Sequence, residues 1–452
     1  MDLTKYLFRQ SGSSWRIFTM PAVNQLSLAE RLMAFMLGRS SSTDAILASQ
    51  TAESANLFLQ MLIENELGGY VLESIYLLKL EAIFRKIFVT LDGGEVDLFT
   101  AISRQSALEA IKFEKFDNKF VDFLDLTAAL GSEIIWLKGI VASRTCYREP
   151  AQRLSGDFDC FLQSRYLTHL NEILVAAGFH VILDDYGFCN QLGVGPVLAL
   201  DSLFLVPNEE LVPSAVVGYF KNRCPIVDIK FNPLDRGLKM IELDRFLSEV
   251  ESVPWRGRTF LSPGLLDQLL ISLTHLEKDR FIGWKQLLDI KLLAEKINLH
   301  PQGWKEFVRR CQVEGLSTAC CAGLSLARER LGLSGIDDVI SETGATGQNI
   351  SKRLLAFTVT PLFYWNTSSL PMLLANAAVS DDSTRKMNVL RRSFFPDKSF
   401  LSAYYLAGRT MNFVDYLRAL ILHWFVILLP GGVVRRTFGQ LIWPERQIGS
   451  SG

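Results

Sequence analysis

The chain lacks the cysteine spacing of a disulfide framework or a zinc ribbon. Its 452 residues include seven cysteines, an odd number, and no two of them form a Cys-x-x-Cys pair. Cysteines in such a pattern are typical of a protein in a reducing compartment. Residues 1–4 (MDLT) have neither the basic nor the apolar segment that opens a secretory signal peptide. We therefore expect a cytoplasmic protein.

The chain also lacks an excess of charge of either sign. Its 47 lysines and arginines balance 48 aspartates and glutamates, which gives a net charge of −1. Such a chain has no global field that attracts a polyanion, so we do not expect nucleic acid as a partner. Phosphate-binding P-loops and dinucleotide-binding glycine motifs are missing from the sequence. No Ser/His/Asp or Cys/His arrangement indicates a nucleophile.

One hydrophobic run stands out, but it is too short to cross a membrane. Residues 419–429 read ALILHWFVILL, whereas a membrane-spanning helix needs about twenty apolar residues. We expect a buried helix at this position. Because Arg435 and Arg436 follow the run, interfacial membrane association of residues 413–434 is the alternative.

Hydrophobic periodicity predicts an α+β fold. Residues 25–128 repeat apolar positions at helical spacing and end in a long amphipathic helix over 106–130. From there to residue 236, short apolar segments with turns between them alternate with one clear helix, a pattern that predicts a mixed sheet flanked by helices. The helix is expected at 166–177, and the strands at 133–137, 157–162, 179–184, 201–206 and 225–231.

The remainder of the chain is predicted to be helical again. Amphipathic patterns indicate helices at 265–275 and 283–296, whereas 337–349 and 377–386 are rich in polar residues or glycine and are expected to be loops. We therefore divide the chain into an N-terminal helical region, an α+β core, a helical domain and a C-terminal helical region, with boundaries 1–128, 129–236, 237–336 and 337–452.

An Asp-x-Asp pair, Asp157 and Asp159, is the most informative feature of the sequence. On a strand, alternate side chains leave on the same face, so these two carboxylates lie about 6.5 Å apart along the strand and point together. Two facing anions repel each other unless a cation lies between them. Such oxygen ligands suit Mg²⁺, or Mn²⁺ in its place, with water and phosphate completing the shell. The alternative is an acidic turn after Ser155 and Gly156.

A third acid, Asp228, alternates with apolar residues on the strand predicted at 225–231. It should face the same side as Lys230 and point away from Val227 and Ile229. If this strand lies beside the strand of the acidic pair, three carboxylates meet and could hold two divalent ions about 4 Å apart. A strand-end cap or a salt bridge with Lys230 is the alternative for Asp228.

Residues upstream of the acidic pair suit a phosphate group. Gly139 follows the first predicted strand of the core, where a glycine lets the backbone approach a ligand closely. The amides at the start of the following helix suit a polyphosphate, and Lys138 would add a point charge. Arg153 could hold the phosphates through two hydrogen bonds or could pair with one of the aspartates.

At these motifs the chain resembles the uncharacterised nucleotidyltransferase family of the DNA polymerase β-like nucleotidyltransferase superfamily. The resemblance extends over about residues 100–420, is strongest over 134–231, and rests on Leu137-Lys138-Gly139, Arg153-x-Ser155-Gly156-Asp157-x-Asp159, Gly178-Phe179 and Val227-Asp228-Ile229. It implies a polymerase β-like mixed sheet with the acidic pair on one strand, the third acid on a neighbouring strand, and helices that wall the nucleotide cleft.

By this resemblance, Asp157, Asp159 and Asp228 are the catalytic acids and metal ligands, and Asp228 is also a candidate base for the acceptor hydroxyl. The nucleotide-binding candidates around them are Lys138, Gly139, Arg153, Ser155 and Lys230. Two positions depart from the pattern. Ile140 follows Gly139 where the superfamily has serine or glycine, and Lys230 stands where the family generally has histidine.

The helical part supplies further candidates for nucleotide or acceptor binding. His275 and Lys278 share one face of a predicted helix because they are three residues apart, although simple packing is the alternative for the histidine. Asp289, within an apolar helix, is expected to cap or to form a salt bridge.

The predicted function is that of an Mg²⁺-dependent nucleotidyltransferase. An acceptor hydroxyl attacks the α-phosphorus of an NTP, with ATP as the first choice, and pyrophosphate leaves. The acceptor stays open among a small molecule, a peptide and a protein. The alternative is a catalytically degenerate scaffold of the same fold that binds a nucleotide or a partner, which Lys230 and Ile140 motivate.

Overall fold

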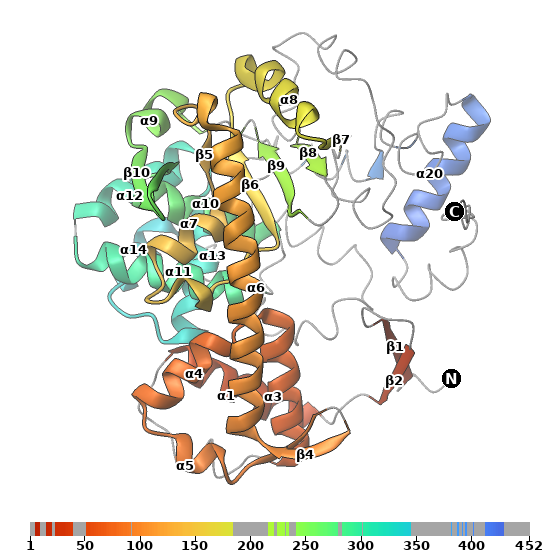
Figure 1. Ribbon diagram of the computed structural model, residues 1–452, viewed down its shortest axis with the longest axis vertical. Coiled ribbons are helices and arrows are strands. Elements are labelled where there is room, and N and C mark those ends of the chain that lie inside the picture. Colours follow the sequence, from red (N-terminus) through yellow and green to blue (C-terminus); the bar gives the residue numbers. More distant parts are fainter. Residues whose placement is uncertain are drawn as a thin grey trace. The chain divides into compact units, whose positions relative to one another are not determined.

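Figure 1 shows a computed structural model of the whole chain. It describes residues 5–9, 15–19, 23–38, 51–91, 93–183, 216–220, 224–230, 232–234, 241–278, 283–300, 302–344 and 412–428, with a few single residues between 381 and 401. The chain divides into two compact units, of which the first holds Met1–Ile111 with Arg330–Gly332 and the second holds Lys112–Glu329 with Leu333–Gly452. The candidate site lies wholly within the second unit.

The first unit is mainly helical, as the periodicity predicts. Its helices are α1 (Val23–Gly38), α3 (Ala52–Asn65), α4 (Gly68–Leu77), α5 (Glu81–Phe84) and the first part of α6 (Leu98–Leu126). The expectation of uninterrupted helices is wrong between residues 88 and 97, where β3 (Phe88–Leu91) and β4 (Gly94–Asp97) form an antiparallel hairpin. Gly93 has a φ of 82° at the turn, a conformation that glycine adopts without strain. A second hairpin joins β1 (Lys5–Arg9) to β2 (Trp15–Thr19).

The described part of the second unit is built on a mixed sheet of seven strands. In spatial order the strands are β10 (Glu251–Trp255), β11 (Arg258–Ser262), β5 (Ile135–Trp136), β6 (Asp157–Phe161), β9 (Ile226–Lys230), β8 (Val216–Phe220) and β7 (His180–Leu183). Both parallel and antiparallel pairs occur, because β6 runs parallel to β9 and antiparallel to β5. The predicted α+β fold with a mixed sheet is confirmed.

Four of the five predicted strands lie where the sequence indicates, as β5, β6, β7 and β9. The fifth, at 201–206, lies outside the described residues. Strands β8, β10 and β11 were not predicted. The hairpin of β10 and β11 lacks a clean apolar alternation and contains Pro254, which is tolerated near the edge of a sheet. Its turn residues Arg256 and Gly257 both have positive φ, 45° and 75°, as a two-residue hairpin turn requires.

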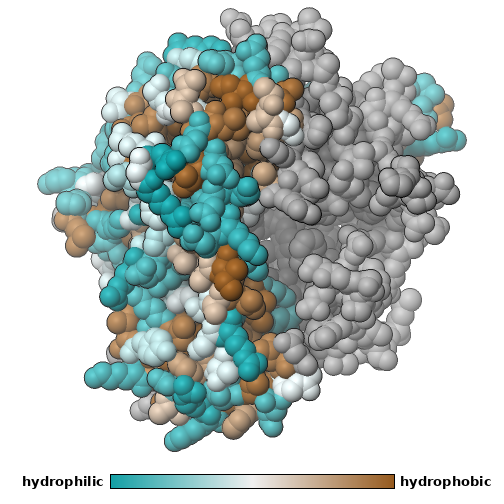
Figure 2. Space-filling model, viewed as in Figure 1, coloured by the Kyte–Doolittle hydropathy of each residue, from teal (hydrophilic) through white to brown (hydrophobic). Residues whose placement is uncertain are grey.

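One face of the sheet is covered by α6, from Lys112 onward, and by α8 (Leu167–Ala176) (Figure 1). Phe120 and Phe123 of α6 pack there against Trp136 and Phe158, with ring centroids 4.9–5.7 Å apart. These rings belong to one buried cluster that also contains Cys160 and the apolar residues of α8. Figure 2 shows the outer surface on this side, where hydrophilic side chains cover much of the described part.

The remaining helices lie between the sheet strands or after them in the chain. They are α7 (Lys138–Thr145), α9 (Leu243–Ser248), α10 (Leu265–Lys278), α11 (Trp284–Asn298), α12 (Gln302–Val313), α13 (Ser317–Leu331), α14 (Asp337–Thr343) and α20 (Phe413–Leu428). The predicted loop at 337–349 is wrong for its first half. Helix α14 starts there with two acids in its first turn, buries Val339 and Ile340, and ends before Gly344. The polar segment 377–386 lies almost entirely outside the described residues.

Helix α20 contains the hydrophobic run of the sequence and is buried along one face. Ala419 and Leu420 pack with Leu401, whereas Ile421 and Phe425 are 49% and 40% exposed. The expected buried helix is therefore confirmed for one face only. Within the described parts of the chain, none of the helices combines the length and the hydrophobicity that a membrane span needs.

Candidate active site

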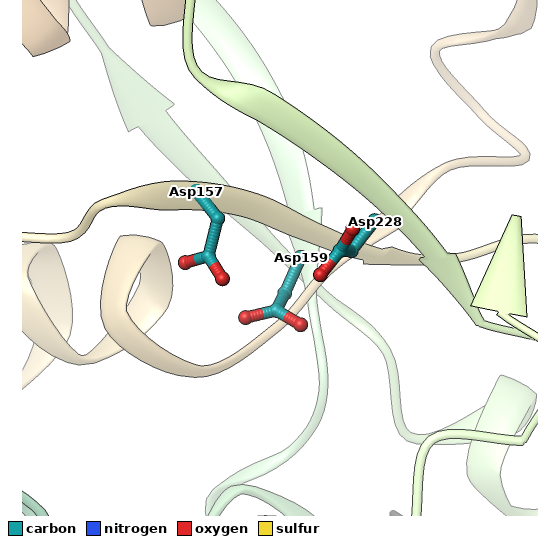
Figure 3. A group of neighbouring side chains, drawn as sticks. All are labelled: Asp157, Asp159 and Asp228. Atoms are coloured by element: carbon teal, nitrogen blue, oxygen red, sulfur yellow. The ribbon is translucent and has the colours of Figure 1, made fainter. Parts of the chain in front are cut away.

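Three carboxylates meet on the two central strands of the sheet. Asp157 and Asp159 lie on β6, and Asp228 lies on β9 directly opposite Asp159 in the parallel register. One carboxylate oxygen from each acid can be chosen such that all three oxygens lie within 4.8 Å of one another. Figure 3 shows the three side chains gathered on one side of the two strands. The sequence pattern anticipated this arrangement, because it depends only on alternation and on the pairing of the two strands.

The apolar neighbours of the acids fix the direction in which the carboxylates point. Phe158 and Cys160 of β6 are buried in the cluster beneath α6 and α8, and so are Val227 and Ile229 of β9. Alternate residues of a strand point to opposite faces, so the three acids lie on the other face of the sheet. Asp159 is 6% exposed there. Burial of four apolar side chains therefore holds three anions close together.

The crowding of negative charge changes the acidity of the first acid. The negative charge of Asp159 and then burial raise the pKa of Asp157 to about 7, and the charge of Asp228 adds to the shift, whereas Lys138 and Lys230 oppose it. Carboxylates that share a small buried volume cannot all ionise unless a cation neutralises them. Hard oxygen ligands in this number fit a divalent cation such as Mg²⁺.

Two lysines supply positive charge at the same site. The Nζ atoms of Lys138 and Lys230 each lie 3.2 Å from Oδ1 of Asp159, and the side chains are 7% and 4% exposed. Lys230 follows Asp228 by two residues on β9 and therefore shares its face, as predicted. Both lysines are thus drawn to the central acid of the cluster.

Lys138 reaches the site through an unusual backbone conformation. It is the first residue of α7, directly after β5, and its φ of 54° lies in the left-handed region. A non-glycine residue there costs about 1–2 kcal/mol. The amide of Leu137 donates a 3.0 Å hydrogen bond to the carbonyl of Asp159. This bond ties the β5–α7 connection to the acid-bearing strand and brings Lys138 to Asp159.

Gly139 is required for close packing inside the protein. A Cβ atom at this position would lie 2.6 Å from Oγ and 3.2 Å from Cβ of Ser155. The hydroxyl of Ser155 itself donates to the carbonyl of Asp157 at 3.3 Å. The start of α7 and the turn before β6 are therefore packed closely together, and a side chain at residue 139 would force Ser155 to move.

Arg153 pairs with an acid that its local sequence does not suggest. Its guanidinium donates to both carboxylate oxygens of Asp289 on α11, at 2.8–3.0 Å, and both side chains are buried. The hydroxyl of Tyr147 donates to the same carboxylate at 2.7 Å. Burial alone would lower the pKa of Arg153, but the charge and the hydrogen bonds of Asp289 raise it above its usual value. Asp289 thus forms the salt bridge expected of it, and Arg153 anchors the turn that leads to Asp157.

With this geometry in place, comparison with known proteins identifies the family. Residues 52–332 match the sequence model of a family described as an uncharacterised nucleotidyltransferase. The chain belongs to this family. The match includes every strand of the seven-stranded sheet, and so all three acids and Asp289 fall within it. It starts earlier than the resemblance noted from the motifs and does not include residues 333–420. No curated protein and no solved structure matches the chain.

The two candidates from the helical part lie on α10. His275 is half-buried, and Lys278 is the last residue of the helix, with a side chain outside the described residues. Helix α10 packs against α7 and α11. The role of both residues in binding stays a prediction.

Sequence reasoning did not foresee how the helices around the sheet support the site. Tyr147 joins the Arg153–Asp289 pair, and Lys285 donates from α11 to the carbonyl of Leu154 at 3.3 Å. These contacts join residues more than a hundred positions apart. No local sequence pattern predicts these contacts, although a lone acid in an apolar helix, such as Asp289, indicates a buried partner.

Proposed function

We propose that this family member is an Mg²⁺-dependent nucleotidyltransferase that transfers an NMP group from an NTP to a hydroxyl acceptor and releases pyrophosphate. The observation that carries the proposal is the meeting of Asp157, Asp159 and Asp228 within 4.8 Å on adjacent strands. A purely structural role does not account for three carboxylates packed this closely, because their mutual repulsion destabilises the fold. Membership of a nucleotidyltransferase family supports an NTP as the donor. ATP is our first choice, and the acceptor is a small molecule, a peptide or a protein.

The residues of the site have two roles in the reaction, which are charge neutralisation and proton transfer. A divalent cation held by the three acids would neutralise the triphosphate and stabilise the charge that develops on it. Lys138 and Lys230 lie beside Asp159 and provide positive charge for phosphate oxygens. A carboxylate oxygen of Asp228 accepts the proton of the acceptor hydroxyl. The hydroxyl oxygen then forms a bond to the α-phosphorus while the bond from that phosphorus to the bridging oxygen breaks, and pyrophosphate departs.

A direct test removes two of the three acids. The Asp157→Ala/Asp159→Ala double variant should lose nucleotide transfer by at least about a thousandfold, since positioning and charge stabilisation make up most of the catalysis. The assay follows label from α-labelled ATP into candidate acceptors. The Asp122→Ala/Asp125→Ala variant is a matched control, because it removes two exposed acids from α6. Transfer at the wild-type rate by the first variant would contradict the proposal.

The second candidate function is a scaffold that binds a partner without catalysis. It is favoured by the pairing of Lys138 and Lys230 with Asp159, which already neutralises part of the acidic cluster. Calorimetry separates the two functions. The enzyme should bind ATP more tightly when Mg²⁺ is present. A scaffold of this kind should either bind ATP with the same affinity with and without Mg²⁺ or not bind ATP.

A further inference from the structure

Asp159 is the central member of the acidic cluster and already has two cationic neighbours. It lies two residues from Asp157 on β6 and opposite Asp228 on β9. Two ammonium groups, from Lys138 and Lys230, contact its Oδ1 at 3.2 Å each. The site therefore combines three negative charges with two positive charges that belong to the chain itself.

This distribution of charge is unsuited to a pair of divalent ions. Two ions about 4 Å apart need an acid that bridges them, and Asp159 holds the bridging position between the other two acids. An oxygen that already accepts two ammonium groups is a poor bridge between two further cations. With all three acids ionised, one divalent ion would bring the cluster from one excess negative charge to one excess positive charge, and a second ion would raise the excess to three positive charges.

The lysines are held in place by their backbone and by burial. Lys230 lies in the ladder between β6 and β8, where it pairs with Phe161 and Val216, and its side chain is 4% exposed. Lys138 is 7% exposed and starts α7 with left-handed backbone geometry. Neither ammonium group can reach bulk water without loss of this packing, so each remains near Asp159 as a fixed charge.

We propose that the site binds one divalent cation, and that Lys138 and Lys230 take the place of the second cation of a two-metal centre. This inference rests on the proposed function and specifies how the donor is bound. In it, the lysines neutralise phosphate oxygens that a second metal would otherwise neutralise. Our expectation from the sequence, two ions held by three acids, is replaced by one ion and two lysines.

The number of bound ions provides the test and does not depend on turnover. Wild-type protein is saturated with Mn²⁺ and a non-hydrolysable α,β-methylene ATP, and bound Mn²⁺ is counted by equilibrium dialysis and by electron paramagnetic resonance. We expect one Mn²⁺ per chain and a spectrum without coupling between two manganese ions. Two coupled ions per chain would overturn the inference and leave the proposed function intact. No bound ion would overturn both.

Variants of the lysines sharpen this result. Without nucleotide, Lys230→Met should lower the Kd for Mn²⁺ by about tenfold or more, because it removes a positive charge that competes with the metal. The Lys138→Met/Lys230→Met variant should bind two Mn²⁺ per chain. If the double variant does not fold, the single variant decides, and an unchanged or higher Kd would contradict the inference.

Lys291 offers a matched control for loss of a buried lysine. It is 5% exposed and pairs with Glu295 at 2.5 Å on α11. Lys291→Met should therefore leave both the number of bound Mn²⁺ ions and their Kd unchanged. An effect as large as that of Lys230→Met would show that the loss of any buried lysine alters metal binding, and the inference would fail.

Discussion

Asp289→Asn removes the charge that neutralises a buried arginine next to the site. Asp289 and Arg153 are 4% and 7% exposed. Two guanidinium nitrogens of Arg153 donate hydrogen bonds of 2.8–3.0 Å to the two carboxylate oxygens of Asp289. An asparagine has nearly the same shape but no charge, so the guanidinium would remain buried without a counter-ion. The hydroxyl of Tyr147 would retain a weaker acceptor.

The expected loss of folding stability is large, although the substitution only replaces one carboxylate oxygen by an amide nitrogen. Breaking a buried ion pair by removing one partner costs about 3–5 kcal/mol, a large fraction of the stability of an ordinary domain. Asp125→Asn is the matched control, because Asp125 also forms a two-pronged pair with an arginine, Arg258, but both side chains are about half exposed. Water screens that pair, so its loss should be close to the limit of detection.

Urea denaturation of the full chain measures the difference. Buried Trp136 and Trp284 belong to the same unit as the pair and report its unfolding by fluorescence. We expect a clear downward shift of the midpoint for Asp289→Asn and almost none for Asp125→Asn. Because Arg153 anchors the turn before Asp157, the first variant should also bind Mn²⁺ less tightly. Equal midpoints for the two variants would refute our interpretation of the pair as an anchor of the site.

Three further predictions concern the turn before β6 and the titration of the first acid. Gly139→Ala should destabilise the protein by about 1–3 kcal/mol, because the new methyl group would overlap Ser155. Gly156→Ala, which meets nothing within 4 Å, should not, and equal thermal midpoints would show that the close approach is not real. Because the pKa of Asp157 is raised to about 7, the metal-free folded state retains a proton that the unfolded chain releases near pH 4. Wild-type protein should therefore lose stability relative to Asp157→Asn between pH 4 and 7, and parallel pH profiles in urea denaturation would contradict this. Since metal competes with that proton, the affinity for Mn²⁺ should fall as the pH drops below 7, by up to about tenfold per pH unit; a Kd independent of pH between 5 and 7 would contradict it.

The acidic cluster could be predicted because its geometry follows from short-range rules. Asp157 and Asp159 share a face because they are two residues apart on a strand, and Asp228 shares a face with Lys230 for the same reason. Apolar residues between them determine which face is buried. Only the pairing of the two strands lay beyond local sequence, and the family resemblance supplied it.

The support of the site could not be predicted, because its contacts join distant parts of the chain. The sequence around Arg153 offers phosphate or a nearby aspartate as partners, whereas its carboxylate partner lies on a helix 136 residues away. Likewise, Gly139 suggested a close approach to a ligand, yet the side chain that approaches it closely is Ser155. Such pairings depend on how helices pack against the sheet, and periodicity carries no information about that packing.

Strands β10 and β11 were missed for the same physical reason. β10 and β11 are five residues each and consist largely of polar or partly exposed residues. Among their apolar side chains only Phe260 is fully buried in the core, while Val253 and Trp255 are partly buried, so the two strands leave only a weak apolar alternation in the sequence. The short helix α14 was missed because Gly344 and Gly347 suggested a loop, although the helix ends before both of them.

The position of the transferred phosphorus tests the central claim most directly. Wild-type protein is incubated with Mg²⁺, candidate acceptors and ATP that carries label either on the α- or on the γ-phosphate. The account predicts acceptor labelling from α-labelled ATP only, and none when Asp157 and Asp159 are both replaced by alanine. Labelling from the γ-phosphate, or equal labelling by the double variant, would contradict it.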